Sequence, residues 1–313
     1  TPSLLRMIVM FVRTSIALLF ASVLALSGCA SAPSDTGVAD GKLQVAVAFY
    51  PFQLVAERIG GSQVTVTNLT PPGSEPHDLE LAPRQVAGLA EADLVVLQSG
   101  FQPAVDNAVT QVTPKRTVDT ATFLTFLTAD ADDHSAADHA EDSHNHGADD
   151  PHTWLDPTNL VVVAEHVRDA LSEAKPEAKA EFTANTEALT KDLIALDEDF
   201  KTGLTKCERN TFITSHAAFG YLAHRYGLTQ VGIRGLEPDV EPSAARIAEV
   251  QQIARTEGVT TIFFETLVSP VVSRSIAGDL GLAVDVLDPL EGISADSRGN
   301  DYLEVMRANL AAL

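Results

Sequence analysis

Early in the chain, short apolar runs alternate with segments of helical periodicity. The apolar runs lie at residues 43–49, 64–69 and 93–97, with helical patterns at 52–59 and 83–92 between and around them. Runs of this length are typical of strands, and their alternation with helices is typical of βαβ units. The first part of the chain is therefore predicted to form a mostly parallel sheet flanked by helices.

The same alternation returns after residue 210. Strand-like runs lie at 211–214, 229–233, 259–264 and 283–287, with helices predicted up to Tyr226, at 242–257 and at 302–313. The last two strand-like runs are almost continuously apolar, as strands buried on both faces of a parallel sheet should be. We therefore expect an α/β protein with two lobes, each built on a mostly parallel sheet.

Between these two regions the pattern predicts one long helix, which we place at 176–205. Pro176 suits the first turn of a helix, and no Gly or Pro follows until Gly203. Apolar residues form a single stripe, made of Phe182, Leu189, Leu193, Leu196, Phe200 and Leu204. A helix of this length spans about 40 Å. A coiled-coil dimer is an alternative, but one short stripe favours a rigid connector packed on the chain's own lobes, 42–175 and 206–313.

The N-terminal segment has the pattern of a secretory signal. Arg6 and Arg13 precede an apolar stretch at 16–26, which is too short for a comfortable membrane span. The sequence Leu-Ser-Gly-Cys at 26–29 resembles a bacterial lipobox. We therefore expect cleavage of residues 1–28, lipidation of Cys29, a flexible tether at 29–41 and an extracytoplasmic protein anchored to the cell membrane. The alternative is an ordinary signal peptide with an incidental cysteine.

The net charge and the cysteine count exclude some classes of protein. The 313 residues hold 21 Lys and Arg against 43 Asp and Glu, a net charge of −22. Binding to nucleic acid is disfavoured, because it needs clustered basic side chains. Two cysteines exclude a disulfide-rich scaffold, and a disulfide between Cys29 and Cys207 would compete with lipidation. The acidity is compatible with a protein that handles cations.

Part of this acidity lies in one histidine-rich segment, residues 130–150. It contains eight acidic residues, no Lys or Arg, and His134, His139, His144 and His146. Such a composition cannot bury apolar surface, so a loop within the first lobe is predicted. Histidine-rich tracts suggest metal binding, and we expect an auxiliary, weaker site here. The alternative is a solvated acidic linker.

Four further residues are candidate ligands of a tighter metal site. His77 follows the second strand, His152 follows the acidic segment, and His216 and Asp288 lie at the carboxyl ends of strands. In open α/β sheets, ligands bind beyond the carboxyl ends of the strands. Each residue alone is more often a capping or core residue, but the four together predict a tetrahedral site of the kind that binds Zn²⁺.

The surrounding motifs resemble one family specifically. The phrases PHDLEL, DPHTWLDP, SHAAFGYLAHRYGL and the ending LDPLEG…YLEVMRANLAAL are similar to those of the zinc/manganese ABC-transporter solute-binding proteins (ZnuA-like). This resemblance implies two lobes joined by a backbone helix, with an interlobe metal site at His77, His152, His216 and Asp288. It further implies delivery of the metal to a permease powered by a cytoplasmic ATPase.

The same resemblance bears on the choice of metal. Manganese members commonly carry Glu where this chain has His216, and an acidic histidine-rich loop is typical of zinc members. Both features favour Zn²⁺ over Mn²⁺. The chain departs from the family at Leu79, where Tyr is usual. Glu75, Glu80 and Glu265 are expected to contact the ligands or the lobes rather than the metal.

Three functions remain open at this point. A metal receptor for transport, monomeric and not an enzyme, is the interpretation we favour. A zinc hydrolase would need an open coordination position for water, which Asp288 would close, and no H-E-x-x-H helix is present. A surface adhesin or metal-buffering lipoprotein on the same scaffold is the third.

Overall fold

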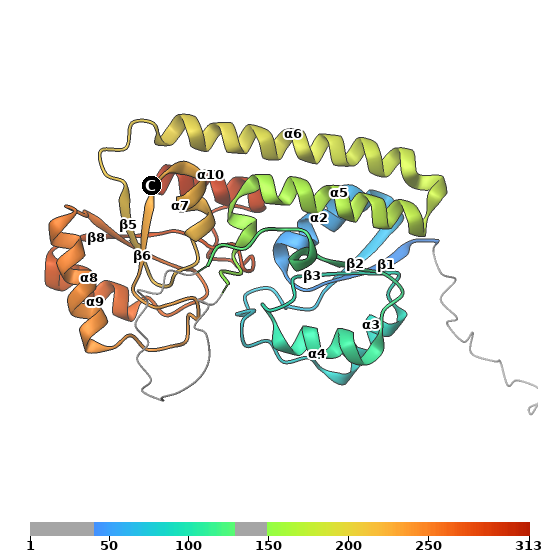
Figure 1. Cartoon of the computed structure of the whole chain (residues 1–313), viewed down its shortest axis with the longest axis horizontal. Coiled ribbons are helices and arrows are strands. Elements are labelled where there is room, and N and C mark those ends of the chain that lie inside the picture. Colours follow the sequence, from blue (N-terminus) through green and yellow to red (C-terminus); the bar gives the residue numbers. More distant parts are fainter. Residues whose placement is uncertain (1–40, 129–148) are drawn as a thin grey trace, which may run out of the picture. The chain divides into compact units, whose positions relative to one another are not determined.

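Two four-stranded parallel sheets form the frame of the protein (Figure 1). The computed structural model describes residues 41–128 and 149–313. The predicted signal segment, Cys29 and the four histidines at 134–146 lie outside the described residues. The first sheet has the order β2-β1-β3-β4, with the strands β1 (Leu43–Val47), β2 (Val64–Asn68), β3 (Leu94–Leu97) and β4 (Thr117–Asp119).

The second sheet repeats this order as β6-β5-β7-β8. Its strands are β5 (Thr211–Thr214), β6 (Thr229–Gly232), β7 (Thr261–Phe264) and β8 (Ala283–Val286). In each sheet the second strand along the chain pairs with one edge of the first strand, and the third strand pairs with the opposite edge. Such a reversal leaves a crevice beyond the carboxyl ends of the two adjacent strands, which are β1 and β3 in one sheet and β5 and β7 in the other.

Helices follow the strands as the periodicity predicts. The first half contains α2 (Tyr50–Gly60), α3 (Pro83–Glu91), α4 (Pro103–Val112) and α5 (Pro157–Ala174), with short 3₁₀ turns η1 (Gly61–Gln63), η2 (Thr120–Thr122) and η3 (Thr153–Leu155). Asp156 accepts a hydrogen bond from the backbone N–H of Thr158, and Pro157 occupies the first turn. This capping fixes the start of α5 directly after the segment that carries His152.

The second half contains α7 (Gly220–Tyr226), α8 (Ala244–Thr256), α9 (Val271–Leu280) and α10 (Tyr302–Ala312). Ser243 and Asp301 cap α8 and α10 by accepting bonds from backbone N–H groups in the first turn. With the two parallel sheets, these helices confirm the predicted α/β fold class.

The predicted connector consists of a short turn, η4 (Pro176–Ala178), and the long helix α6 (Lys179–Leu204). Figure 1 shows α6 running past both sheets, and it packs on α2 and α5 at one end and on α7 and α10 at the other. Five stripe residues are fully buried, namely Phe182, Leu189, Leu193, Leu196 and Phe200. The stripe therefore packs against the chain itself.

One hydrophobic core joins the two sheets. It contains Phe49 and Leu94 from the first sheet region together with Phe212 and Phe263 from the second. A smaller cluster around Ile262 lies within the second sheet region. As a consequence, Lys42–Leu313 forms one compact unit. The lobe boundaries at 175/176 and 205/206 stay predictions. Within residues 41–128 and 149–313, no helix is both long and apolar enough to cross a bilayer.

Candidate metal centre

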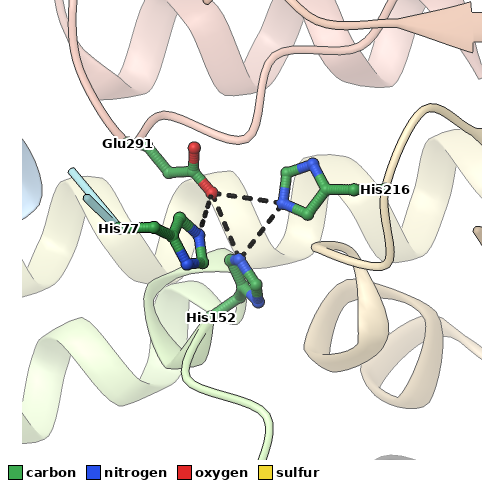
Figure 2. Close-up of side chains that lie close together, drawn as sticks. All are labelled: His77, His152, His216 and Glu291. Atoms are coloured by element: carbon green, nitrogen blue, oxygen red, sulfur yellow. Dashed lines mark hydrogen bonds and ion pairs between the residues drawn. The ribbon is translucent and has the colours of Figure 1, made fainter. Parts of the chain in front are cut away.

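Three histidines and one glutamate converge at a buried point (Figure 2). The Nε2 atoms of His77, His152 and His216 lie 3.4, 3.1 and 3.3 Å from Oε1 of Glu291. Among the described residues these four form the group that could hold a metal ion, with one candidate ligand atom each, all within 4.8 Å of one another. Three imidazole nitrogens and one carboxylate oxygen are a donor set that suits tetrahedral Zn²⁺.

His77 is positioned by the loop after β3. The side-chain amide of Gln102 donates to the carbonyl of Pro76, at 3.1 Å, and to the hydroxyl of Thr70, at 3.0 Å. The backbone N–H of His77 donates to Glu75. Because Gln102 is buried, these bonds hold the loop after β2 against the carboxyl end of β3.

His152 is held in the same way by a second glutamine of that loop. Gln98 donates to the carbonyl of Pro151 and accepts a bond from the hydroxyl of Thr153, at 2.7 Å. Gln98 and Gln102 therefore fix, from one short segment, the residues that flank two of the three histidines. The bond to Thr153 is buried and the bond to Pro151 is partly buried, so their loss would leave unpaired polar groups in the interior.

His216 follows β5, and its partner Glu265 follows the adjacent strand β7. Glu265 accepts bonds from the hydroxyl of Ser215 and from the backbone N–H of His216, while its other oxygen lies 2.6 Å from Nδ1 of His216. This pair lies beyond the carboxyl ends of the two strands where the second sheet reverses its order, the place expected for a ligand.

Each histidine has a carboxylate behind it. The Nδ1 atoms of His152, His216 and His77 face Asp150 at 2.7 Å, Glu265 at 2.6 Å and Glu237 at 3.3 Å, respectively. A carboxylate that accepts the Nδ1–H bond fixes the tautomer that leaves Nε2 available as a ligand, and it makes that nitrogen more basic. All three Nε2 atoms accordingly face the centre of the group.

The carboxylates on both sides of the imidazole rings shift the pKa values of the histidines. Burial opposes protonation of His77, but Glu237 and Glu291 outweigh it and raise the imidazole pKa to about 10. Burial also opposes protonation of His216, and Glu265 and Glu291 together raise its pKa well above the usual range. Burial would raise the pKa of Glu291, yet His216, His152 and His77 hold it well below its usual value. The carboxylates around His77 and His216 therefore favour the protonated form of both rings, and the histidines favour the ionised form of Glu291.

The structure differs from the sequence-based expectation at Asp288. Its carboxylate does not join the group that the described residues form. It accepts a bond from the backbone N–H of Leu290 at 2.8 Å, and bonds from the hydroxyls of Ser297 and Thr266. Leu290 adopts a left-handed backbone conformation, with φ of 60°, and this turn directs the following residue, Glu291, to the histidines.

Glu291 was missed because residue type alone cannot separate two acids three positions apart. Both follow β8 within the motif LDPLEG. The choice between them depends on the direction of the turn, which is further fixed by Asn309, whose side chain donates to the carbonyl of Asp288. Trp154 donates to the carbonyl of Pro289 at 2.7 Å, which ties the same turn to the segment that carries His152.

Comparison with known proteins decides the family. The profile of the family described as zinc-uptake complex component A, periplasmic (ZnuA), matches residues 45–313. A high-affinity zinc uptake system protein, ZnuA of Bacillus subtilis, is 33% identical over 302 residues, which are 94% of this chain and 94% of that protein. The chain belongs to the ZnuA family.

Other ZnuA-family relatives are longer. The zinc-binding lipoprotein AdcA of Streptococcus pneumoniae is 36% identical over 303 residues, which cover 95% of this chain. The chain spans about 60% of the length of this relative. A crystal structure of Zn(II)-bound AdcA from the same organism superposes with a TM-score of 0.72 at 33% identity, covering 87% of this chain and 57% of that one.

A further relative of known structure is the laminin-binding protein Lmb of Streptococcus agalactiae. It has a TM-score of 0.74 at 30% identity, covering 87% of this chain and 97% of that one, and is described as a bifunctional protein with adhesin and metal transporting activity. These likenesses extend over both sheets of the present structure, so the family assignment and the fold agree.

Three acids named from the sequence, Glu75, Glu80 and Glu265, are not members of the four-residue group. Glu265 lies behind His216, as expected for a ligand-orienting residue, whereas Glu80 is exposed. Glu75 is partly buried, and burial together with the charge of Glu291 raises its pKa to about 7. One of its oxygens holds the N–H of His77, and the other has no hydrogen-bond partner among the described residues.

Proposed function

We propose that this protein is an extracytoplasmic receptor that captures Zn²⁺ and delivers it to the permease of an ABC transporter driven by a cytoplasmic ATPase. The observation that carries the proposal is the buried group of His77, His152, His216 and Glu291. Membership of the ZnuA family and the zinc-binding names of its relatives support it.

The donor set favours zinc over manganese. Imidazole nitrogen suits Zn²⁺, whereas Mn²⁺ prefers sites rich in carboxylate and water oxygens. Three nitrogens and one carboxylate provide the four donors of a closed tetrahedral site. Asp288 was expected to supply the fourth donor, and Glu291 takes that role in the proposal.

A closed site also favours a receptor over an enzyme. Zinc hydrolases use three protein ligands and keep the fourth position for a water molecule that the metal activates. Here Glu291 faces all three histidines, so a bound zinc would already have four protein donors. Members of the ZnuA family are solute-binding proteins.

We further propose that the protein is anchored to the membrane through lipidated Cys29, and that it acts as a monomer. The lipobox-like sequence at 26–29 supports the anchor, as does the lipoprotein name of the pneumococcal relative. The histidines of the 130–150 segment, namely His134, His139, His144 and His146, are proposed to gather zinc weakly next to the ligand His152.

The test is the metal content of untagged protein expressed without residues 1–28, before and after a chelator wash. We expect one Zn²⁺ per chain that resists washing, and additional zinc that does not. Titration with Mn²⁺ provides the comparison and should show weaker binding. Protein that retains no zinc, or that binds Mn²⁺ more tightly, would contradict the proposed function.

A further inference from the structure

The three histidine–carboxylate pairs of the site are not equivalent. The carboxylates of Asp150 and Glu265 are buried, with 6% and 1% of their side chains exposed. Glu237, which faces His77, is 65% exposed. Its oxygen also lies farther from its imidazole, at 3.3 Å, than the oxygens of the other two pairs. The Glu237–His77 pair is therefore open to water, whereas the other two pairs are sealed, meaning that both of their side chains are buried.

The pairs also differ in which parts of the chain they join. Asp150 is two residues before its histidine, and Glu265 and His216 both follow strands of the second sheet. Glu237, in contrast, lies in the loop between β6 and α8 of the second sheet region, while His77 follows β2 of the first. The Glu237–His77 contact thus joins the two sheet regions at the metal group itself.

The loop that carries Glu237 is anchored beside another ligand. The backbone N–H of Arg234 donates to the carbonyl of Ser215, and the N–H of Ala217 donates to the carbonyl of Gly235. Both bonds hold the start of this loop to the segment that contains His216. Glu237 therefore transmits the position of the His216 segment to His77.

A second polar contact lies beside this pair. Asp239, two residues after Glu237, lies within hydrogen-bonding reach of Asp78, the neighbour of His77. The Glu237–His77 contact is exposed enough for water to compete with it.

We propose that Glu237 is the positioning residue for His77, and that the Glu237–His77 pair is the contact that opens when metal enters or leaves the site. This inference rests on the proposed zinc-receptor function. A metal-bound His77 keeps its Nδ1–H for Glu237. Without the negative charge of the carboxylate this bond is weaker, so the ring is freer to turn away from the metal while the two sealed pairs stay in place. Removing a carboxylate of this kind costs about 10–100-fold in metal affinity.

The test compares Glu237→Gln, Glu237→Asp and the matched control Glu241→Gln, which changes an exposed carboxylate of the same loop. Zinc dissociation is followed by chelator competition, and association by stopped-flow mixing. We expect Glu237→Gln to raise the dissociation rate by about 10-fold or more. Glu237→Asp should recover part of the loss, and Glu241→Gln should match the unmodified protein.

Two further readouts separate positioning from a general structural role. The Co²⁺-substituted protein should show an altered ligand-field spectrum in Glu237→Gln and an unaltered one in Glu241→Gln, because only the former changes the orientation of a ligand. The metal-free Glu237→Gln protein should keep the circular dichroism of the unmodified protein, because the side chain is mostly in solvent and the fold does not depend on it.

The outcomes are distinguishable. If the unmodified protein binds zinc tightly and Glu237→Gln releases it at the normal rate, the inference is overturned while the proposed function stands. Equal acceleration in Glu241→Gln would also overturn it, since a general charge effect would then explain the result. If the unmodified protein binds no zinc, the proposed function fails, and the inference fails with it.

Discussion

At the scale of single residues, the site depends on carboxylates placed on both sides of imidazole rings. Glu291 lies at the centre, where it contacts the Nε2 atoms of His77, His152 and His216. One of its oxygens, Oε2, is buried and has no hydrogen-bond partner among the described residues. A buried charge is costly unless a cation or donor compensates it, and here the three histidines compensate the charge of Glu291 through its other oxygen.

The first prediction separates the two acids of the LDPLEG motif. We expect Glu291→Gln to weaken zinc binding by about 10-fold or more, because a charged ligand is lost. Asp288→Asn should have a smaller effect, because an amide oxygen can still accept the bond from Leu290 that forms the turn. Isothermal titration calorimetry of zinc binding to both variants measures the two losses of affinity. A larger loss in Asp288→Asn would indicate that Asp288, as the sequence suggested, is the ligand.

The second prediction concerns the pH dependence of metal binding. Unperturbed imidazoles titrate near pH 6.5, which predicts weaker binding only below about pH 6. In the structure the pKa of His77 is about 10 and that of His216 is well above its usual range. Zinc must then displace protons even at neutral pH, so its affinity should keep rising from about pH 6 to pH 9.

Calorimetry in buffers of different ionisation enthalpy measures these protons directly. Net proton release on zinc binding near neutral pH is the expected result. An affinity that levels off just above pH 7, with no proton release, would show that the rings are already neutral in the metal-free protein.

The third prediction is for the stability of the metal-free protein. The folded-state pKa of His77 is raised, so its contribution to the free energy of unfolding is complete below the unfolded value of about 6.5. That contribution is lost as the pH rises through about 10. The melting temperature of metal-free protein should therefore fall over this interval. His77→Gln should show a shallower decline, and an identical decline in both proteins would argue against the assignment.

At the scale of elements, the connector α6 is tied to α7 by one buried carboxylate. Asp197 is 3% exposed and accepts two bonds from Arg225, at 3.0 and 2.9 Å, and one from the hydroxyl of Tyr226. Burial alone would raise its pKa, but Arg225 and Lys201 outweigh that effect and lower it. This arrangement fixes the helix that follows the His216 segment against the connector.

The fourth prediction tests this anchor. Asp197→Asn should lower the free energy of unfolding by about 2 kcal/mol, because charged hydrogen bonds to Arg225 are weakened. Glu198→Gln is the matched control, since Glu198 is an exposed neighbour on the same helix that pairs with Lys201. Such surface pairs contribute about 0–1 kcal/mol. Denaturant unfolding in the presence of chelator is the measurement, and equal losses in both variants would contradict the prediction.

At the scale of the whole molecule, both sheets share one core and several polar contacts between distant segments. Tyr302 of α10 donates to the carbonyl of Trp154 at 2.6 Å, and Tyr221 of α7 donates to the carbonyl of Asp150. The indole of Trp154 in turn donates to Pro289. These contacts tie the segment that carries His152 to the second sheet region, and they favour local loop movement over a wide separation of the sheets.

The fifth prediction concerns the histidine-rich segment, most of which lies outside the described residues. Its ends are joined by a bridge between Thr128 and Asp149 and by a bond from the N–H of Asp150 to the carbonyl of Leu127. A short glycine–serine linker in place of residues 130–148 should therefore leave the fold and the tight zinc unchanged. The weakly held zinc should disappear, and uptake at scarce zinc should slow. Loss of the tight zinc, or unchanged uptake, would contradict this prediction.

Local sequence was sufficient to predict most of the elements. The strand-like runs, the helix periodicity and the single stripe of α6 reflect which side chains must be buried, and burial follows a repeat that the sequence displays. The three histidines were predicted for a related reason, because they lie in loops at the carboxyl ends of strands or beside conspicuous turn motifs.

Which carboxylate faces which histidine was decided by the tertiary structure. Asp288 and Glu291 have the same chemistry, and the left-handed turn at Leu290 selects between them. Glu265 was expected near the ligands, but its pairing with His216 depends on two neighbouring strands. Glu237 was not expected at all, because it reaches His77 from a distant position through a contact between loops that no local pattern records. A sequence pattern thus determined what the chain buries and which residue types could bind a metal. The directions of turns, and the pairing of loops across two sheets, determined which charges surround that metal.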